Sequence, residues 1–443
     1  MLMVLRTSLV VLAVAVALVS ESAGADPTWT GGGDGTTWSD GANWDTGSAP
    51  TGGYANVGNT DVDRTITVSG TKTAPHWTQT NAGAVNTLQL DGEWEMCCYN
   101  ASPQWDNTSG DPASMVMDLN GHTLKTLDGG VQYLENITIQ GPGTYLSTRK
   151  RDFMAGTVIG AGVVVQSNWD GGNIRPGSIW SPDSTLSIHA DGVWTGAGVT
   201  IGNVDVATKT WNYNGAYTVQ NVTVAAGQKI YFAGGITQQL KIQGNFTDPN
   251  TTGNYSPNGG KLTFNGSGSV QEVNIQRPLT QTIKISDGAS VQLNHDLDTS
   301  GSTATNPHES IMLGGSSLDL NGNDFSANRL VMIGPSITWG VSGAEQSVIN
   351  IGADGAHFIN STDVTIKDLG GWAGGDLTLF NVDPAATVQG GFSLGTLTLP
   401  GYYTSDGIAI EGKNVVLKNV VVPEPTSLML LAVGLLGAWI RRR

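Results

Sequence analysis

The sequence Met117-Asp118-Leu119-Asn120-Gly121-His122-Thr123-Leu124 decides the fold class of this chain. Its apolar residues alternate with polar ones up to an Asn-Gly pair, and a second alternating stretch begins directly after that pair. A period of two is typical of a β-strand with one buried and one solvated face. A related sequence, Leu318-Asp319-Leu320-Asn321-Gly322-Asn323, recurs far downstream. The recurrence indicates a protein built from repeated short strands and glycine-containing turns.

Looser copies of the same pattern run through most of the chain. They occupy residues 88–92, 186–192, 262–266, 283–288 and 349–355. Between Asp26 and Val422 the sequence offers no sustained apolar stripe at the spacing of an amphipathic helix. We therefore predict an all-β protein in which helix is nearly absent.

Two architectures can be built from such strands. An Asn-Gly pair between apolar runs usually indicates a hairpin, which would give antiparallel β-sandwich domains. However, Asp287-Gly288 is followed by Ser290-Val291-Gln292-Leu293, a strand that does not simply fold back in register. Single glycine-containing corners that repeat along a chain favour a solenoid. We expect a parallel β-helix over residues 26–421, with antiparallel sandwich domains as the alternative.

Composition narrows the possible partners. The 443 residues include 61 glycines, only 13% are charged, and the formal net charge is −16. Such an acidic surface repels nucleic acids and anionic lipids, so we exclude both as partners. The two cysteines, Cys97 and Cys98, are adjacent and cannot join distant segments. They form either a strained vicinal disulfide or two small buried side chains.

The first 25 residues have the features of a signal peptide. Arg6 precedes an apolar run over residues 9–19, and Ala23 and Ala25 lie three and one positions before a cleavage site at Asp26. We therefore expect residues 1–25 to be removed and the mature chain to begin outside the cytoplasm.

The last residues have the features of a second targeting segment. Pro423-Glu424-Pro425 precedes an apolar segment, residues 428–440, and three arginines end the chain. Thirteen helical residues span about 20 Å, which is short of the ~30 Å hydrocarbon core of a bilayer. We expect this transmembrane helix to anchor the chain in the inner membrane only transiently. A proline-rich stalk before a retained tail anchor is the alternative.

These three parts, in this order, make residues 422–443 resemble the PEP-CTERM sorting signal. The resemblance implies export in a Gram-negative-type bacterium and recognition by an exosortase, a membrane cysteine transpeptidase-like enzyme. It also implies that Pro423, Glu424 and Pro425 are the residues recognised.

The start of the mature chain, residues 26–60, is rich in tryptophan and glycine. Trp29 leads a W-x-G-G sequence, Trp38 a W-S-D sequence and Trp44 an N-W-x-x-G-x-x-P sequence. This spacing resembles autotransporter-associated β-strand repeat proteins, which implies a β-helical surface protein. The three tryptophans could stack on sugars, but we favour a role in closing the end of the apolar core.

Catalytic motifs are weak. Residues 391–395 read Gly-Phe-Ser-Leu-Gly and match a serine-nucleophile motif, but a strand follows where that chemistry needs a helix, and no histidine lies downstream of Ser393. The six histidines are scattered singly. We expect no enzymatic activity.

Metal-binding patterns are incomplete. Residues 294–298, together with His308 and Glu309, mix possible ligands, and we interpret them as solvated loop. Asp319, Asn321 and Asn323 have the alternating oxygens of a calcium loop, but Asp324 stands where the sharp turn requires glycine. A structural turn explains the pattern, so we expect no metal and no cofactor.

The sequence therefore predicts an exported structural or adhesive protein of the cell surface or extracellular matrix. An exosortase is its expected partner, and exopolysaccharide or envelope components are further candidates. The alternative is a glycan-binding or polysaccharide-lyase-like β-helix, for which Arg149-Lys150-Arg151 is the tightest basic cluster. Clustered Arg, Lys and Asp on one face would favour the lyase, and a ladder of Asn, Thr and Ser would favour the structural role.

Overall fold

The computed structural model describes most of the mature body. The described residues are 26–51, 54–57, 62–70, 74–80, 83–96, 105–126, 132–168, 171–233, 237–253, 255, 260–286, 288–301, 309–343, 345–401 and 403–423. The predicted signal peptide with Ala23 and Ala25, Cys97-Cys98, His308, Glu424, Pro425 and the helix over residues 428–440 lie outside them.

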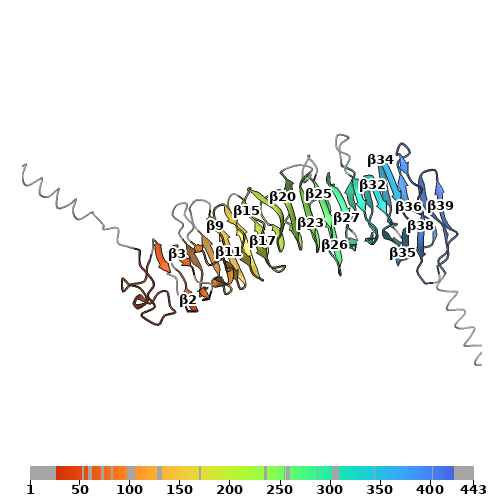
Figure 1. Ribbon diagram of the computed structural model, residues 1–443. Helices are drawn as coiled ribbons and strands as arrows, with labels where there is room; N and C mark the ends of the chain where they lie inside the picture. Colours follow the sequence, from red (N-terminus) through yellow and green to blue (C-terminus); the bar gives the residue numbers. More distant parts are fainter. Residues whose placement is uncertain are drawn as a thin grey trace, which may run out of the picture.

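The body is a rod of stacked β-strands (Figure 1). The described residues contain two short 3₁₀ helices, η1 (Gly41–Asn43) and η2 (Pro112–Ser114), and no α-helix. Over this same part of the chain, no helix is long and apolar enough to cross a membrane. The all-β prediction is confirmed.

Four sheets run along the rod. Sheet 1 contains β1 (Tyr54–Val57), β3 (Ala74–Gln79) and β6 (Trp105–Asn107). Sheet 2 contains β2 (Arg64–Val68), β4 (Asn86–Leu90), β7 (Met115–Asp118), β10 (Thr138–Gln140), β13 (Val158–Ile159) and β16 (Ile179–Trp180).

Sheet 3 has 14 strands and runs nearly the full length. They are β5 (Trp94–Met96), β8 (Thr123–Thr126), β11 (Gly143–Ser147), β14 (Val163–Ser167), β17 (Thr185–Ile188), β19 (Asn203–Val206), β21 (Val222–Val224), β24 (Phe246–Asp248), β26 (Val270–Ile275), β28 (Ser290–Leu293), β31 (Ser317–Asp319), β33 (Ser336–Ser342), β35 (Thr362–Gly370) and β38 (Leu394–Thr398).

Sheet 4 covers another side of the rod. Its strands are β9 (Gln132–Leu134), β12 (Arg151–Phe153), β15 (Gly172–Ile174), β18 (Val193–Thr200), β20 (Trp211–Val219), β22 (Ile230–Phe232), β23 (Gln239–Ile242), β25 (Lys261–Phe264), β27 (Thr282–Ile285), β29 (Leu297–Thr299), β30 (Glu309–Met312), β32 (Phe325–Ile333), β34 (Ile349–Ile359), β36 (Gly375–Val382), β37 (Val388–Gln389), β39 (Gly407–Glu411) and β40 (Asn414–Val420).

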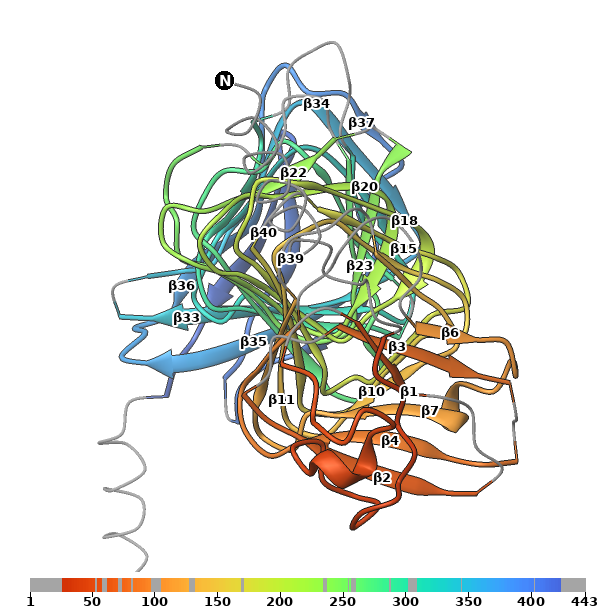
Figure 2. The same ribbon diagram turned by 90° about the vertical axis from the view of Figure 1, so that its left-hand side faces the viewer.

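The connectivity is that of a parallel β-solenoid of about 12 turns. The chain visits the sheets in turn, and the strands before β39 pair in parallel with strands of neighbouring coils, as Thr144 of β11 does with Thr123 of β8. The view along the axis shows the coils superimposed (Figure 2). The parallel β-helix prediction is therefore confirmed, and the alternative of antiparallel sandwich domains is wrong.

Along each strand of alternating sequence, every second side chain points into the coil. Leu88 and Leu90 of β4 are fully buried, whereas Gln89 between them is partly exposed. Burying one aliphatic side chain stabilises the fold by roughly 1.5–3 kcal/mol, and the same contact is repeated in every coil. This repetition explains how the described body, which has few charged residues and no α-helix, forms a continuous core.

The Asn-Gly pairs form corners rather than hairpins. Asn120 and Gly121 both have positive φ angles, 46° and 84°, as do Asn321 and Gly322, at 50° and 87°. These angles suit a tight turn, which is why the same pair usually joins antiparallel strands. Here the Asn120 side chain donates a hydrogen bond of 3.0 Å to the carbonyl of Leu90, one coil earlier. The turn is thereby tied to the preceding coil, and the chain continues into the next sheet.

Both ends of the solenoid are closed. At the N-terminal end Trp29, Trp38 and Trp44 pack over the first coils. At the C-terminal end β40 pairs antiparallel with β36 and with β39, which breaks the parallel pattern. These elements cover the two ends of the core, while β38, the last strand of sheet 3, pairs on one side only among the described strands, with β35.

Candidate functional site

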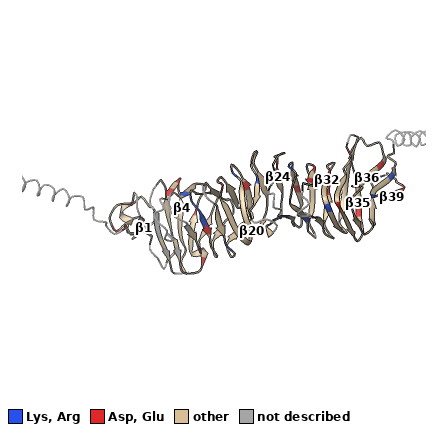
Figure 3. Cartoon of the chain, turned by 90° about the horizontal axis from the view of Figure 1, so that it is seen from above, with Lys and Arg blue, Asp and Glu red and all other residues tan. Residues whose placement is uncertain are grey.

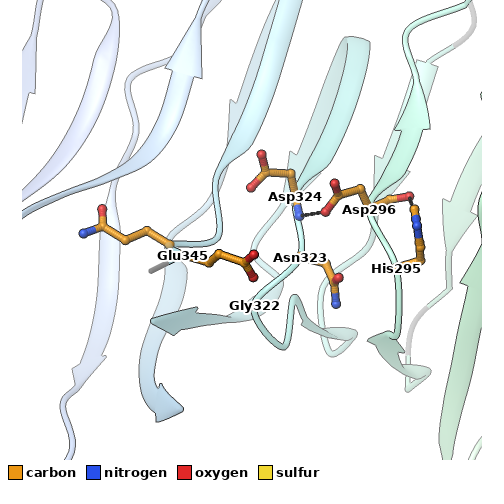
Figure 4. Close-up of a pocket in the computed structure, with 7 residues that line it drawn as sticks. His295, Asp296, Gly322, Asn323, Asp324 and Glu345 are labelled. Carbon is orange, nitrogen blue, oxygen red and sulfur yellow. Dashed lines mark hydrogen bonds between the residues drawn. The ribbon is translucent and has the colours of Figure 1, made fainter. Parts of the chain in front are cut away.

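A cleft of about 340 Å³ lies where three successive coils turn (Figure 4). Its lining residues are His295, Asp296, Gly322, Asn323, Asp324, Glu345 and Gln346. They come from the turns that follow β28, β31 and β33, so each coil supplies one part of the wall. Residues 294–298 and the Asp319 loop are separate candidates in the sequence, and the solenoid register brings them side by side.

The carboxylates of the cleft bind backbone groups of the neighbouring coil. Asp296 Oδ1 accepts a hydrogen bond of 2.8 Å from the backbone N–H of Asp324 (Figure 4). Asp324 Oδ1 accepts one of 2.8 Å from the backbone N–H of Val348. Burial raises the pKa of Asp324, and the nearby charges of Asp296 and Glu345 raise it further, against the opposing effect of the Val348 bond. The side chains thus serve first to hold the turns together.

The cleft does not have the geometry of a metal centre. Within the described residues, no group of three or more His, Cys, Asp or Glu side chains is arranged to hold a metal ion. Glu309, which the sequence places near this loop, instead forms an ion pair of 2.7 Å with Arg329 on sheet 4. The cleft is therefore best described as a polar corner of the solenoid.

A lysine ammonium group contacts the loop over residues 319–323, whose sequence resembles a calcium site. Lys367 Nζ lies 3.2 Å from Asp319 Oδ2 and 3.2 Å from Asn321 Oδ1. Asp319 Oδ1 accepts the backbone N–H of Asn321 at 2.8 Å, as Asp118 does for Asn120 in the earlier copy of the sequence, at 3.1 Å. The side-chain oxygens of Asp319 and Asn321 are thus engaged within the protein, as a structural turn requires.

Ser393 contacts the neighbouring coil through its hydroxyl and its carbonyl. Its hydroxyl lies 3.2 Å from that of Ser361, and its carbonyl accepts the backbone N–H of Thr362. Among the described residues no histidine hydrogen-bonds to it. The residue lies just before β38, between strands, whereas a serine nucleophile needs a base and a strand-to-helix turn.

The three N-terminal tryptophans are buried against one another. Trp29, Trp38 and Trp44 are 6%, 3% and 3% exposed, and Trp38 also contacts Trp94 with ring centroids 5.7 Å apart. Trp44 packs edge-on against Trp38 at 4.7 Å, and its indole N–H donates to the Trp38 carbonyl. A sugar-stacking ring needs one open face, and in this packing the rings cover the core instead.

The basic cluster Arg149-Lys150-Arg151 does not form one surface patch. Arg151 is 2% exposed, and its guanidinium donates to the hydroxyls of Tyr145, at 3.0 Å, and of Thr126 inside the coil. Along the described body, the positions of acidic and basic residues are scattered (Figure 3). The arrangement of basic and acidic groups that would favour a lyase is therefore not formed by these residues.

An amide ladder on the outside of the rod is the feature that the sequence pattern did not localise. Asn221 Nδ2 donates to Asn203 Oδ1 at 2.8 Å, and Asn221 Oδ1 accepts the backbone N–H of Asn245 at 2.7 Å. Asn245 Oδ1 accepts the N–H of Glu272, whose Oε2 accepts from Asn294 Nδ2 at 3.3 Å. The ladder crosses five successive coils. Its members are separated unevenly in the chain, so only the fold reveals it.

The described chain ends at Pro423, just beyond the C-terminal closure. Val420 is buried at the end of β40, and Val422 packs partly against the core. The two prolines and the glutamate of the predicted sorting motif thus begin where the solenoid stops. The geometry defines the chain as a closed parallel β-solenoid with an appended C-terminal segment.

Comparison with known proteins identifies that segment. Residues 421–443 match the family model of the PEP-CTERM protein-sorting motif, one residue longer than the segment 422–443 expected from the sequence. The chain is thus a β-solenoid protein that carries the PEP-CTERM tag. No curated protein shows a significant match to the chain.

The tag carries a functional meaning of its own. It is the recognition tag of an exosortase and implies export, processing at the membrane and a surface or extracellular destination. A β-solenoid body fits a surface protein.

Proposed function

We propose that this chain is a structural or adhesive element of the cell surface or extracellular matrix, and that it has no catalytic activity. In this proposal residues 1–25 direct export with cleavage after Ala25, and an exosortase processes the tag after a transient stay in the inner membrane. The body then acts as a stiff spacer or contact surface.

The amide ladder from Asn203 to Asn294 is the observation that supports this role best. Its amide and carboxylate groups bind the neighbouring coil rather than converging on a reacting atom. Hydrogen bonds of this kind each add about 0.5–1.5 kcal/mol to stability. A row of them along a rod favours stiffness and durability, which are the properties needed in a matrix.

Localisation in the native host tests the proposal. The complete chain should reach the cell surface or medium, whereas a chain ending at Val420 lacks the apolar segment over residues 428–440 and should accumulate in the periplasm. A matched variant with Pro423→Ala and Glu424→Ala keeps the apolar segment and the arginines, and should be retained in the inner membrane fraction. Surface delivery of both altered chains would overturn the proposal.

The ends of the exported protein provide a second readout. N-terminal sequencing should begin at Asp26, and intact mass should show loss of the segment over residues 428–443. Full-length protein to Arg443 in purified envelopes would contradict the processing step.

The second candidate function is glycan binding. The observation that favours it is a group of three lysines on sheet 4, Lys241, Lys261 and Lys284, which form no ion pair with an acidic side chain of the described residues.

A further inference from the structure

Three lysines on adjacent strands of sheet 4 form a cationic surface. Lys241, Lys261 and Lys284 belong to β23, β25 and β27, which pair in parallel in that order. Each lies between two buried core residues of its strand or directly before one, so its side chain points outward. Lys261 is exposed, and Lys241 and Lys284 are partly exposed. We name these three residues the lysine stripe.

The cross-strand neighbours of the stripe carry no negative charge. Lys241 faces Thr218 and Thr263, Lys261 faces Gln239 and Thr282, and Lys284 faces Thr263 and Ile311. In the part of the chain that the structure describes, none of the three ammonium groups forms an ion pair. Other lysines do so: Lys125, Lys209, Lys367 and Lys418 each lie within 3.2 Å of a carboxylate.

Glu309, the acidic residue of β30, which pairs with β27, has a cationic partner of its own. Glu309 of β30 pairs with Arg329 of β32 at 2.7 Å. The stripe therefore keeps its positive charge in a chain whose net charge is −16. At physiological ionic strength charges are screened within about 8 Å. A ligand that lies on the stripe thus responds to these lysines more than to distant acidic residues.

We propose that the lysine stripe binds an extended polysaccharide that carries carboxylate groups. Strands in a sheet lie about 4.8 Å apart, so the backbones of Lys241 and Lys284 are roughly 10 Å apart and Lys261 is offset along the sheet. A flat surface with spaced charges suits a chain molecule, which gains affinity from several weak contacts at once. Gln239 and Thr282 on the same face can hydrogen-bond sugar hydroxyls.

An acidic polysaccharide fits better than a nucleic acid because of where the protein acts. The inference rests on the proposed surface or matrix location, where acidic glycans are available, and it gives the adhesive role a ligand class. Double-stranded DNA has a similar charge density and is therefore the discriminating competitor.

Binding measurements on the purified exported protein test the proposal. The probes are polygalacturonate, neutral dextran and a mixed-sequence DNA duplex at 150 mM salt. The variant Lys241→Gln, Lys261→Gln, Lys284→Gln should bind polygalacturonate at least tenfold more weakly and with a smaller dependence on salt. The control Lys125→Gln, Lys150→Gln, Lys209→Gln has the same net charge and should bind like the unaltered protein.

The outcomes separate clearly. No polygalacturonate binding by the unaltered protein, or equal loss in both triple variants, would overturn the inference. Tighter binding to DNA than to polygalacturonate would contradict the assignment of a polysaccharide as the ligand of the stripe. Unchanged β-sheet circular dichroism in both variants shows that folding is intact, because all six side chains lie outside the core. Missorting of the untagged chain is scored separately, so failure of the proposed location is distinguishable from failure of binding.

Discussion

Arg277 and Asp248 form an ion pair inside the rod: Arg277 Nε lies 2.7 Å from Asp248 Oδ2, and their side chains are 2% and 0% exposed. Asp248 ends β24, and Arg277 follows β26 in the next coil. The hydroxyl of buried Tyr255 also donates to Asp248, and burial together with that carboxylate raises the pKa of Tyr255. The ion pair therefore joins the segment after β24 to the segment after β26 in the next coil.

Breaking this pair should destabilise the protein strongly. Arg277→Met leaves the carboxylate of Asp248 buried without its counter-charge, which typically costs about 3–5 kcal/mol. The measurement is the urea midpoint of unfolding. Lys209→Met is the control, because it breaks an ion pair with Asp191 whose side chains are more than half exposed, and exposed pairs contribute about 0–1 kcal/mol. Similar midpoints for the two variants would contradict the structural role.

The tryptophan closure should protect the first coils. Trp38→Ala removes a ring that contacts Trp29, Trp44 and Trp94, and deletion of such a buried ring costs about 3–5 kcal/mol. Compared with the unaltered protein, Trp38→Ala should show faster amide hydrogen exchange in β2 and β4 and unchanged exchange in the distant β33. Tyr133→Ala, at a side chain 44% exposed, is the control and should change neither region. A uniform change along the whole rod would show that the ring does not act locally.

The Ser393 hydroxyl should be dispensable for any chemistry. It is paired with Ser361 and not with a base, so we expect the unaltered protein and Ser393→Ala to behave alike on a panel of ester and glycan substrates. A substrate whose turnover is abolished by the substitution, with the β-sheet spectrum intact, would refute the non-enzymatic proposal.

The cleft carboxylate Asp324 should make stability depend on pH. Folding raises its pKa, so the native state binds this proton more readily than the unfolded chain. The contribution that favours folding is present below the ordinary aspartate pKa of about 3.9 and is lost as pH rises through the higher folded value. Asp324→Asn keeps an oxygen for Val348 and should melt higher than the unaltered protein at pH 7, but not at pH 3.

The control for this effect is Asp183→Asn. Asp183 is exposed in a turn, where a surface substitution usually changes stability by less than about 0.5 kcal/mol. A lower melting temperature for Asp324→Asn at pH 7 would show that the ionised group stabilises the fold.

The sequence was informative about the fold because its two strongest signals are local. Alternation around Leu119 specifies which side chains are buried, and Asn120-Gly121 specifies a turn. Neither signal gives the direction of the next strand. What excludes the hairpin is a contact between coils, such as Asn120 with Leu90, 30 residues earlier. The expectation of a parallel solenoid therefore depended on repetition rather than on any single motif.

Surface features could not be predicted in the same way because the coil length varies. Residues joined between adjacent coils are 18 apart for Asn203 and Asn221 but 30 apart for Leu293 and Asn323. No fixed period therefore aligns Lys241, Lys261 and Lys284, or the corner residues of the cleft. Buried partners such as Asp248 and Arg277 are equally hidden, because their charges suggest exposure until the fold places them.

The antiparallel closure by β40 has a consequence for orientation. The chain leaves the terminal strand β40 at Val420, and the tag begins one residue later. Any attachment through the tag therefore holds the rod at one end rather than along its side. A stiff body held at a tip stands away from its support like a post. The end covered by Trp29, Trp38 and Trp44 is then farthest from the support. The face formed by sheet 4 points to the side, toward the material between neighbouring copies of the protein.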